Sequence, residues 1–216
     1  MEAADVNLEL GETTMKKPLK VQLGAFDCAI DGWENTDITP HIAISRIPGA
    51  AALLYWAGKM SSERYRQHRE GRFRKLRYVD LTRPLPYDDA SVAAVFSSHV
   101  FEHLFWDEVQ KLVREIRRIL MPGGICRVVV PDLDQVVALY SPEDPKPFLE
   151  AIFEIGKRSD IKNSHHTGFT RQSIERLFRD EGFVQTEIVT FGVGRCPDVK
   201  RLDNRPGVSI FFEAVK

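Results

Sequence analysis

The stretch DLTRPLPYDDASVAAVFSSHVFEHLFWDEVQKLVREIRRILMPGGICRVVVPDLD, residues 80–134, contains a continuous apolar run and a mostly apolar one on either side of an amphipathic segment. The runs are residues 92–97 (VAAVFS) and 125–130 (ICRVVV). Apolar runs of this length are typical of parallel strands that are buried on both faces. The stretch therefore predicts two interior strands of a parallel sheet, with a helix between them.

Residues 107–120 form the predicted helix. Their apolar side chains recur at the i, i+3, i+4, i+7 spacing of a core-facing stripe, namely at Val109, Leu112, Val113, Ile116 and Leu120. Asp107 with Gln110 resembles a capping box, and the Pro-Gly-Gly at 122–124 predicts the end of the helix.

The same alternation extends to both sides of this stretch. Further strands are predicted at residues 20–23, 34–38, 73–81, 184–192 and 208–216, and short helices at 51–60 and 61–70. Thr170 is placed to cap a helix that buries Ile174, Leu177 and Phe178 and ends at Gly182. Alternating strands and helices predict a mainly parallel sheet with right-handed crossovers.

Composition limits the class of protein. The chain has 216 residues, 43% of them hydrophobic, and 30 Lys and Arg against 31 Asp and Glu, so its net charge is -1. Collagen, coiled-coil and disordered classes are excluded. Three cysteines and no CxxC pair argue against a disulfide framework or a zinc knuckle. We expect a flexible arm at residues 1–18 and one domain at 19–216. Without an apolar signal core or a run of about 18 apolar residues, we expect a cytoplasmic location.

Ligands of parallel sheets bind beyond the carboxyl ends of the strands. Asp37 ends the second predicted strand, where a carboxylate can accept hydrogen bonds from a ribose diol or cap its own turn. Asp80 ends the third strand and can accept from an adenine amino group or form an Asx turn. Gly24 ends the first strand, where a missing Cβ lets a ligand approach the backbone.

The order of these motifs resembles class I S-adenosylmethionine-dependent methyltransferases. The matching pieces are Asp80, Leu85-Pro86-Tyr87, the apolar strand, Phe101-Glu102-His103-Leu104 and the Pro-Gly-Gly turn. Upstream, VQLGAFDCAIDGWENTDI (21–38) is similar to the opening of a compact bacterial subgroup of type 11-like methyltransferases. The resemblance implies an α/β, Rossmann-like fold. We expect a seven-stranded, mostly parallel sheet with an antiparallel last strand and a helical insertion after the second strand.

The resemblance also implies a cofactor, S-adenosylmethionine, with S-adenosylhomocysteine as its product. It implies a small-molecule or glycan-type acceptor, most plausibly a hydroxyl, and no nucleic-acid partner. The implied contacts are Gly24, Ala25 and Phe26 for methionine, Asp37 and Ile38 for ribose, Asp80 and Leu81 for adenine, and Ser97, Ser98 and His99 for the sulfonium and the acceptor. His99 is the expected base, and His165 and His166 are expected to close on the acceptor.

Two departures from the family keep alternatives open. Phe26 replaces the second glycine of the usual GxG, so a binding or scaffold protein with an impaired cofactor loop is one alternative. The basic cluster at 64–77 (RYRQHREGRFRKLR) makes an RNA methyltransferase another. The insertion at 39–72 is expected to act as a lid over the acceptor, or as a homodimer contact.

His99-Val100-Phe101-Glu102-His103 formally matches the inverted zinc-peptidase motif HxxEH. That motif needs an uninterrupted helix, whereas these residues follow a predicted strand, so the sequence predicts no metal ligand. The connection at 192–207 is long for the last pair of strands and is expected to be functional.

Overall fold

The structure, a computed structural model, describes residues 18–154 and 164–216. The arm expected at residues 1–18 lies outside the described residues, apart from Pro18. Among the described helices, none is long and apolar enough to cross a membrane.

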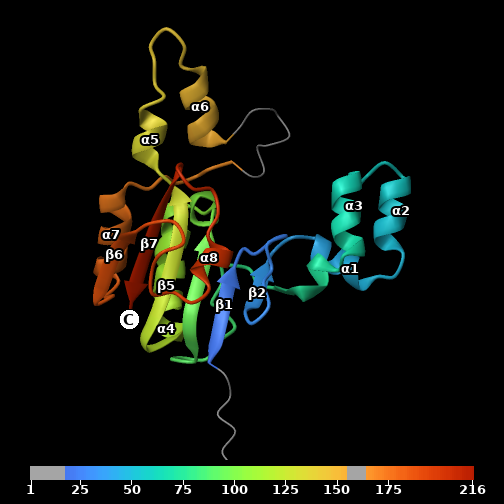
Figure 1. The fold of residues 1–216 in the computed structure, drawn as a ribbon, viewed down its shortest axis with the longest axis horizontal. Helices are drawn as coiled ribbons and strands as arrows, with labels where there is room; N and C mark the ends of the chain where they lie inside the picture. The colour runs from blue at the N-terminus through green and yellow to red at the C-terminus, as the bar shows by residue number, and fades with distance from the viewer. Residues whose placement is uncertain (1–17, 155–163) are drawn as a thin grey trace, which may run out of the picture.

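Seven strands of the described chain form one sheet in the order β3-β2-β1-β4-β5-β7-β6 (Figure 1). β1, β2, β3, β4 and β5 pair in parallel, and β7 lies antiparallel to both β5 and β6. The strands are β1 (Leu19–Leu23), β2 (Glu34–Asp37), β3 (Leu76–Tyr78), β4 (Val92–Ser98), β5 (Leu120–Pro131), β6 (Gln185–Val189) and β7 (Ser209–Val215). The predicted Rossmann-like fold with an antiparallel last strand is confirmed.

Two helices cover one face of the sheet. α4 (Trp106–Ile119) and α7 (Arg171–Asp180) pack their apolar stripes on alternate residues of the central strands, including Val95 and Val128. The predicted cap of α7 is confirmed, because Thr170 Oγ1 accepts a hydrogen bond from Ser173 N at 3.1 Å.

The opposite face is covered mainly by a connection between β6 and β7. This connection, residues 190–208, includes the short helix α8 (Val199–Leu202). Cys196, Val199 and Leu202 pack on Phe96 and the other outward residues of β4, β5 and β7. The long segment that we expected to be functional thus also covers the apolar side chains on the second face of the sheet.

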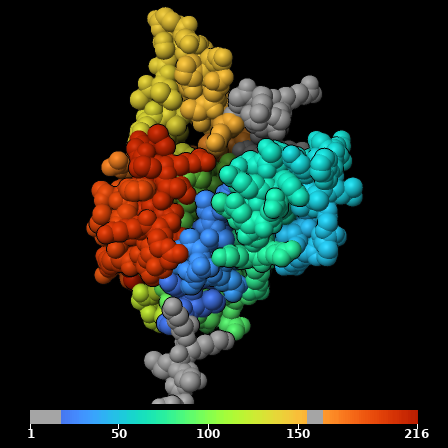
Figure 2. Space-filling model, turned by 45° about the vertical axis from the view of Figure 1, so that its right-hand side comes forward, coloured from blue at the N-terminus to red at the C-terminus, as the bar shows by residue number. Residues whose placement is uncertain are grey.

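The helical insertion after β2 is confirmed, with one more helix than predicted. It contains α1 (His41–Arg46), α2 (Ala50–Trp56), α3 (Ser62–Arg69) and the 3-10 turn η1 (Arg72–Lys75). In Figure 2 it forms a lobe beside the β1–β2 segment. The strand predicted at 73–81 is wrong at its start, because Phe73 lies in η1 with its ring fully buried under the insertion.

Other predicted boundaries also differ. The capping box is not Asp107 with Gln110: α4 starts one residue earlier, and Glu108 Oε2 accepts from Phe105 N at 2.9 Å. Asp107 instead pairs with Lys111 at 2.7 Å. The Pro-Gly-Gly turn lies within β5, after the helix has ended at Ile119. Besides α1 and α8, two further helices were not predicted, α5 (Leu133–Val137) and α6 (Lys146–Phe153), which project beyond the carboxyl end of β5 (Figure 1).

A buried arginine joins the long connection to the sheet. Arg127 in β5 lies opposite Glu213 in β7, and its side chain is fully buried. Its Nη1 donates to Glu213 Oε1 at 3.0 Å, and its Nε donates to Asp203 Oδ1 at 2.8 Å. Nη2 donates to the other Asp203 oxygen, and the two remaining donors bond the carbonyls of Thr190 and Val193. All five N–H donors of the guanidinium are therefore satisfied.

Removing the Asp203 carboxylate should destabilise the protein strongly, because Arg127 would keep a buried charge with one partner fewer. We expect Asp203→Ala to lower the free energy of unfolding by about 3–5 kcal/mol, as for other broken buried ion pairs. Urea unfolding followed by circular dichroism measures the loss. Lys111→Ala, which removes an exposed ion pair, is the control and should leave the midpoint unchanged. Equal effects of the two variants would contradict this view of Arg127.

Candidate active site

The loop after β1 is built for close packing of the backbone. Gly24 has φ +68°, and a Cβ at this position would lie 2.2 Å from Val100 Cγ2. Ala25 N donates to Thr36 O at 2.8 Å, which holds the loop against β2. The structure therefore explains the glycine by contact with the segment that follows β4.

Asp37 connects this loop to the end of β2. Its Oδ2 accepts from Phe26 N at 3.0 Å, and its Oδ1 accepts from Thr39 N at 2.7 Å. Burial raises the pKa of the Asp37 carboxyl, and the backbone hydrogen bonds from Thr39 and Phe26 oppose this rise. The next residue, Ile38, is 57% exposed. A half-buried carboxylate and an apolar side chain thus stand side by side at this edge.

Phe26 directs its ring toward the insertion. The ring lies 6.1 Å from that of Phe73 and 6.5 Å from that of His41, and the Arg64 guanidinium sits 4.4 Å from its centroid. The backbone of Phe26 is in the left-handed region, at φ 43°. The residue that replaces the second glycine therefore contributes to packing between the cofactor loop and the insertion.

Asp80 is engaged in its own turn. Its Oδ1 accepts from Thr82 N at 3.0 Å and from Thr82 Oγ1 at 2.7 Å. The Thr82 hydroxyl hydrogen bond is the main cause that lowers the pKa of the Asp80 carboxyl. This is the Asx-turn alternative named from the sequence, with Leu81 half-buried beside it.

The end of β4 meets the long connection. Ser97 is buried, and its hydroxyl has no hydrogen-bond partner in the described part of the chain. Ser98 Oγ donates to Asn204 Oδ1 at 3.0 Å. His99 Nε2 lies 3.0 Å from Ser209 Oγ, and its Nδ1 lies 3.4 Å from Arg205 Nη1. Sequence reasoning had marked the connection by its length but gave no signal for these particular partners.

Both ring nitrogens of His99 have polar neighbours. Nε2 faces Ser209 Oγ, which also donates to Arg205 O at 3.1 Å. Nδ1 lies 3.1 Å from Glu102 Oε1. His99 itself has φ 53°, a left-handed conformation that turns the chain sharply after β4.

The HxxEH segment does not form the helix of a zinc peptidase. β4 ends at Ser98, and only Phe101–His103 form a 3-10 turn, η2. The structure instead brings His165 to this turn from a distant loop, with ring centroids of His103 and His165 5.1 Å apart. Glu102 was absent from the residues predicted to act in the site.

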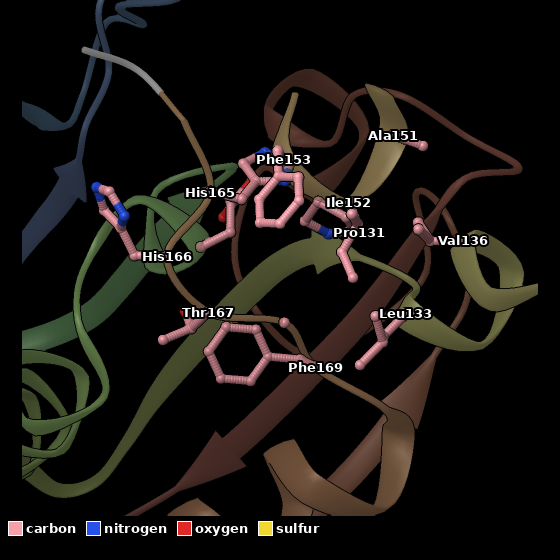
Figure 3. A pocket seen from close by; sticks show the side chains of 12 residues that line it. Pro131, Leu133, Val136, Ala151, Ile152, Phe153, His165, His166, Thr167 and Phe169 are labelled. Carbon is pink, nitrogen blue, oxygen red and sulfur yellow. The ribbon is translucent and has the colours of Figure 1, made fainter. Parts of the chain in front are cut away.

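His165 and His166, both expected to close on the acceptor, line the same cavity, but their rings point in different directions. Residues 151–153 and 165–169, together with Glu102, Pro131, Leu133 and Val136, line a cavity of about 200 Å³ at the end of β5 (Figure 3). His165 lies beside Phe153 on this cavity. His166 is turned away, and its ring stacks on Phe105 at 4.4 Å.

The basic cluster at 64–77 is largely neutralised by neighbouring carboxylates. The cations that pair with an Asp or Glu within 4.0 Å are Arg64, Arg66, Arg72, Lys75 and Arg77. Paired cations present a weak electrostatic footprint for a polyanion.

Comparisons with known proteins agree with this architecture. The model of a methyltransferase domain family matches residues 55–128, from α2 through most of β5. The match begins after the loop that contains Phe26.

Three solved structures illustrate the shared fold. S-adenosylmethionine-dependent methyltransferases from Thermotoga maritima and Archaeoglobus fulgidus are 16% and 13% identical, with TM-scores of 0.51 and 0.54. The alignments cover 94% of this chain and 84% of the first, and 93% of this chain and 87% of the second. Phosphoethanolamine N-methyltransferase 2 of Haemonchus contortus is 15% identical, at TM-score 0.50, over 94% of this chain and 50% of that one.

The structural matches cover more than nine tenths of the chain and show its fold, and the family model matches residues 55–128. The chain therefore has the fold of class I S-adenosylmethionine-dependent methyltransferases, and residues 55–128 are similar to the methyltransferase domain family that the motif order resembles.

Proposed function

We propose that this methyltransferase binds S-adenosylmethionine at the ends of β1 and β2 and methylates a hydroxyl of a small or glycan-type acceptor. The observation that carries the cofactor half is Asp37, whose oxygens bond the loop after β1 and the turn after β2. S-Adenosylmethionine, when bound, supplies an electrophilic methyl group.

The residues at this edge fit the cofactor. Each Asp37 oxygen accepts one backbone N–H, and an ionised carboxylate has about four lone-pair sites, so two remain for a ribose diol. Ile38 offers an exposed apolar surface next to it. Gly24, Ala25 and Phe26 would hold the methionine part through their backbone, Asp80 and Leu81 the adenine, and Ser97 and Ser98 the region of the sulfonium.

The acceptor half rests on the cavity at the end of β5. Its volume of about 200 Å³ is below the ~300–1,000 Å³ of pockets for drug-sized ligands. It therefore suits a small acceptor or one end of a longer glycan. His99 follows the end of β4, and we assign it to take the proton of the hydroxyl. His165 would contact the acceptor, and His166 would support the loop from outside.

The insertion is proposed as a lid for the acceptor rather than for the cofactor. α2 is its most exposed part, with Leu53 71% and Trp56 82% exposed. The base of the insertion is buried instead, because Ile42 and Phe73 pack against Ala25 in the loop after β1. We also propose that the enzyme is cytoplasmic and that α2, the exposed apolar helix of the insertion, forms a homodimer contact.

Cofactor binding tests the first half. Calorimetric titration with S-adenosylmethionine and S-adenosylhomocysteine should give micromolar binding. Asp37→Ala should weaken it about ten- to hundredfold, because a hydrogen bond to a charged group contributes about 1.5–3 kcal/mol. Asp31→Ala, which removes an exposed carboxylate paired with Lys75, should bind like the wild type. A folded chain that binds neither ligand would favour the binding or scaffold alternative instead.

Substituting two glycines in the β1–β2 connection distinguishes the effect of backbone strain from the effect of steric contact. Gly24 and Gly32 both have positive φ, at +68° and +88°, but a Cβ at Gly32 meets nothing within 4 Å. Gly32→Ala should therefore lose only about 1 kcal/mol of stability through strain. Gly24→Ala should lose about 1–3 kcal/mol more by displacing Val100, and should also weaken cofactor binding. Thermal unfolding and calorimetry measure both, and equal losses would rule out the contact as the cause.

A shortened insertion tests the lid. Replacing residues 47–60 with a short Gly-Ser linker removes α2 and keeps the base that packs on the cofactor loop. We expect cofactor affinity to stay at the wild-type value while methyl transfer falls at least tenfold. Methyl-labelled S-adenosylmethionine with a panel of hydroxyl-bearing small molecules and sugars gives the rates. Lost cofactor binding in a folded variant, or an unchanged rate, would reject the lid.

A further inference from the structure

Three side chains near the cavity place metal-type ligand atoms together. One ligand atom each of Glu102, His103 and His165 lies within 4.8 Å of the others. Two of these residues come from η2, and the third comes from a loop more than sixty positions later in the chain. None of them serves the cofactor edge.

Glu102 is the residue that most needs a partner. It is 1% exposed, and neither carboxylate oxygen has a hydrogen-bond partner in the described part of the chain. His99 Nδ1 lies 3.1 Å from Glu102 Oε1 but makes no hydrogen bond to it. A buried ionised carboxylate without a donor is strongly unfavourable unless a cation compensates it.

The two histidines have the surroundings of ligands. His103 Nδ1 lies 3.4 Å from the backbone oxygen of Ser164, and a hydrogen bond from one ring nitrogen to a carbonyl is the usual support of a metal-bound histidine. His165 Nε2 is buried and makes no hydrogen bond, although Glu154 Oε2 lies 2.7 Å away at ion-pair distance.

Backbone hydrogen bonds fix the cluster in place. Glu102 O accepts from His166 N at 2.7 Å and from Thr167 N at 3.1 Å. His165 N donates to Phe153 O at 3.0 Å, and Thr167 Oγ1 donates to Phe101 O at 3.1 Å. The loop that carries His165 is thus held to η2 and to the end of α6 before any ion binds.

We propose that Glu102, His103 and His165 bind a divalent transition-metal cation. Two imidazole nitrogens and one carboxylate oxygen are a donor set that suits Zn²⁺ and its neighbours and disfavours Mg²⁺, which prefers oxygen ligands. Glu102 and His165 both line the cavity, so a further coordination position faces it. An acceptor oxygen in the cavity is the ligand for that position, an assignment of role that rests on the proposed function.

Metal binding is measured on the full chain, stripped with a chelator and titrated with Zn²⁺ against a chromophoric competitor. We expect one site per chain, and at least tenfold weaker binding in Glu102→Gln, His103→Ala and His165→Ala. His166→Ala is the matched control, because His166 is the next residue but its ring stacks on Phe105 away from the cluster. It should bind Zn²⁺ as the wild type does, and Mg²⁺ should not compete.

A cysteine variant covers the case in which a substitution harms folding. His165→Cys, titrated with Co²⁺, should develop a thiolate-to-cobalt absorption band, which only a direct ligand produces. Absence of Zn²⁺ and Co²⁺ binding, equal binding by all variants, or equal losses in His165→Ala and His166→Ala would overturn the proposal.

Failure of the metal site and failure of the cofactor site remain distinguishable. Metal titration needs no S-adenosylmethionine, and calorimetry with S-adenosylhomocysteine is repeated on the stripped and the loaded chain. Metal binding without cofactor binding would keep this site and reject the proposed function. Cofactor binding without metal binding would do the reverse, and a more stable Glu102→Gln would then identify Glu102 as a protonated buried acid.

Discussion

The guanidinium of Arg127 is fully buried in the sheet. The free-energy cost of removing this charge from water is offset only if each of its N–H groups finds an acceptor. Two carboxylates and two carbonyls provide that set, and three of these four acceptors belong to the segment from Thr190 to Asp203. The constraint extends to Gly194, where a Cβ would lie 2.2 Å from Glu213 Oε1. Because Asp203 is held in this way, the next residues reach Ser98 and His99 at the end of β4.

The end of β4 is where the two halves of the site meet. On one side, Val100 packs on Gly24 of the cofactor loop. On the other, the Glu102 backbone oxygen holds the loop of His165 over the cavity. A left-handed turn at His99 separates these neighbours, so one short segment orients the proposed cofactor side and the proposed acceptor side together. This arrangement suits an in-line methyl transfer, in which alignment of the reacting groups is the main contribution of the protein.

Local patterns in the sequence predicted the features that depend on near neighbours. The strands around α4, the cap at Thr170 and the insertion after β2 follow from apolar period and turn chemistry. Features set by contacts between distant parts of the chain were missed. Phe73 was assigned to a strand, because its packing beneath the insertion cannot be seen in the neighbouring residues. His165 and Glu102 are likewise far apart in the sequence and meet only in the folded chain. The HxxEH motif was set aside for lack of a helix, whereas the cluster at Glu102 and His103 draws its third residue, His165, from a separate loop.

The position of β7 has a consequence for the order in which the protein can assemble during synthesis. β7 lies between β5 and β6 in the sheet but is made after both. Until residues 203–213 leave the ribosome, Arg127 has neither of its carboxylates, and β5 and β6 each present an unpaired edge. β1 to β5 can pair with one another before β7 is made, but β6 joins the sheet and Arg127 acquires its carboxylates only afterwards.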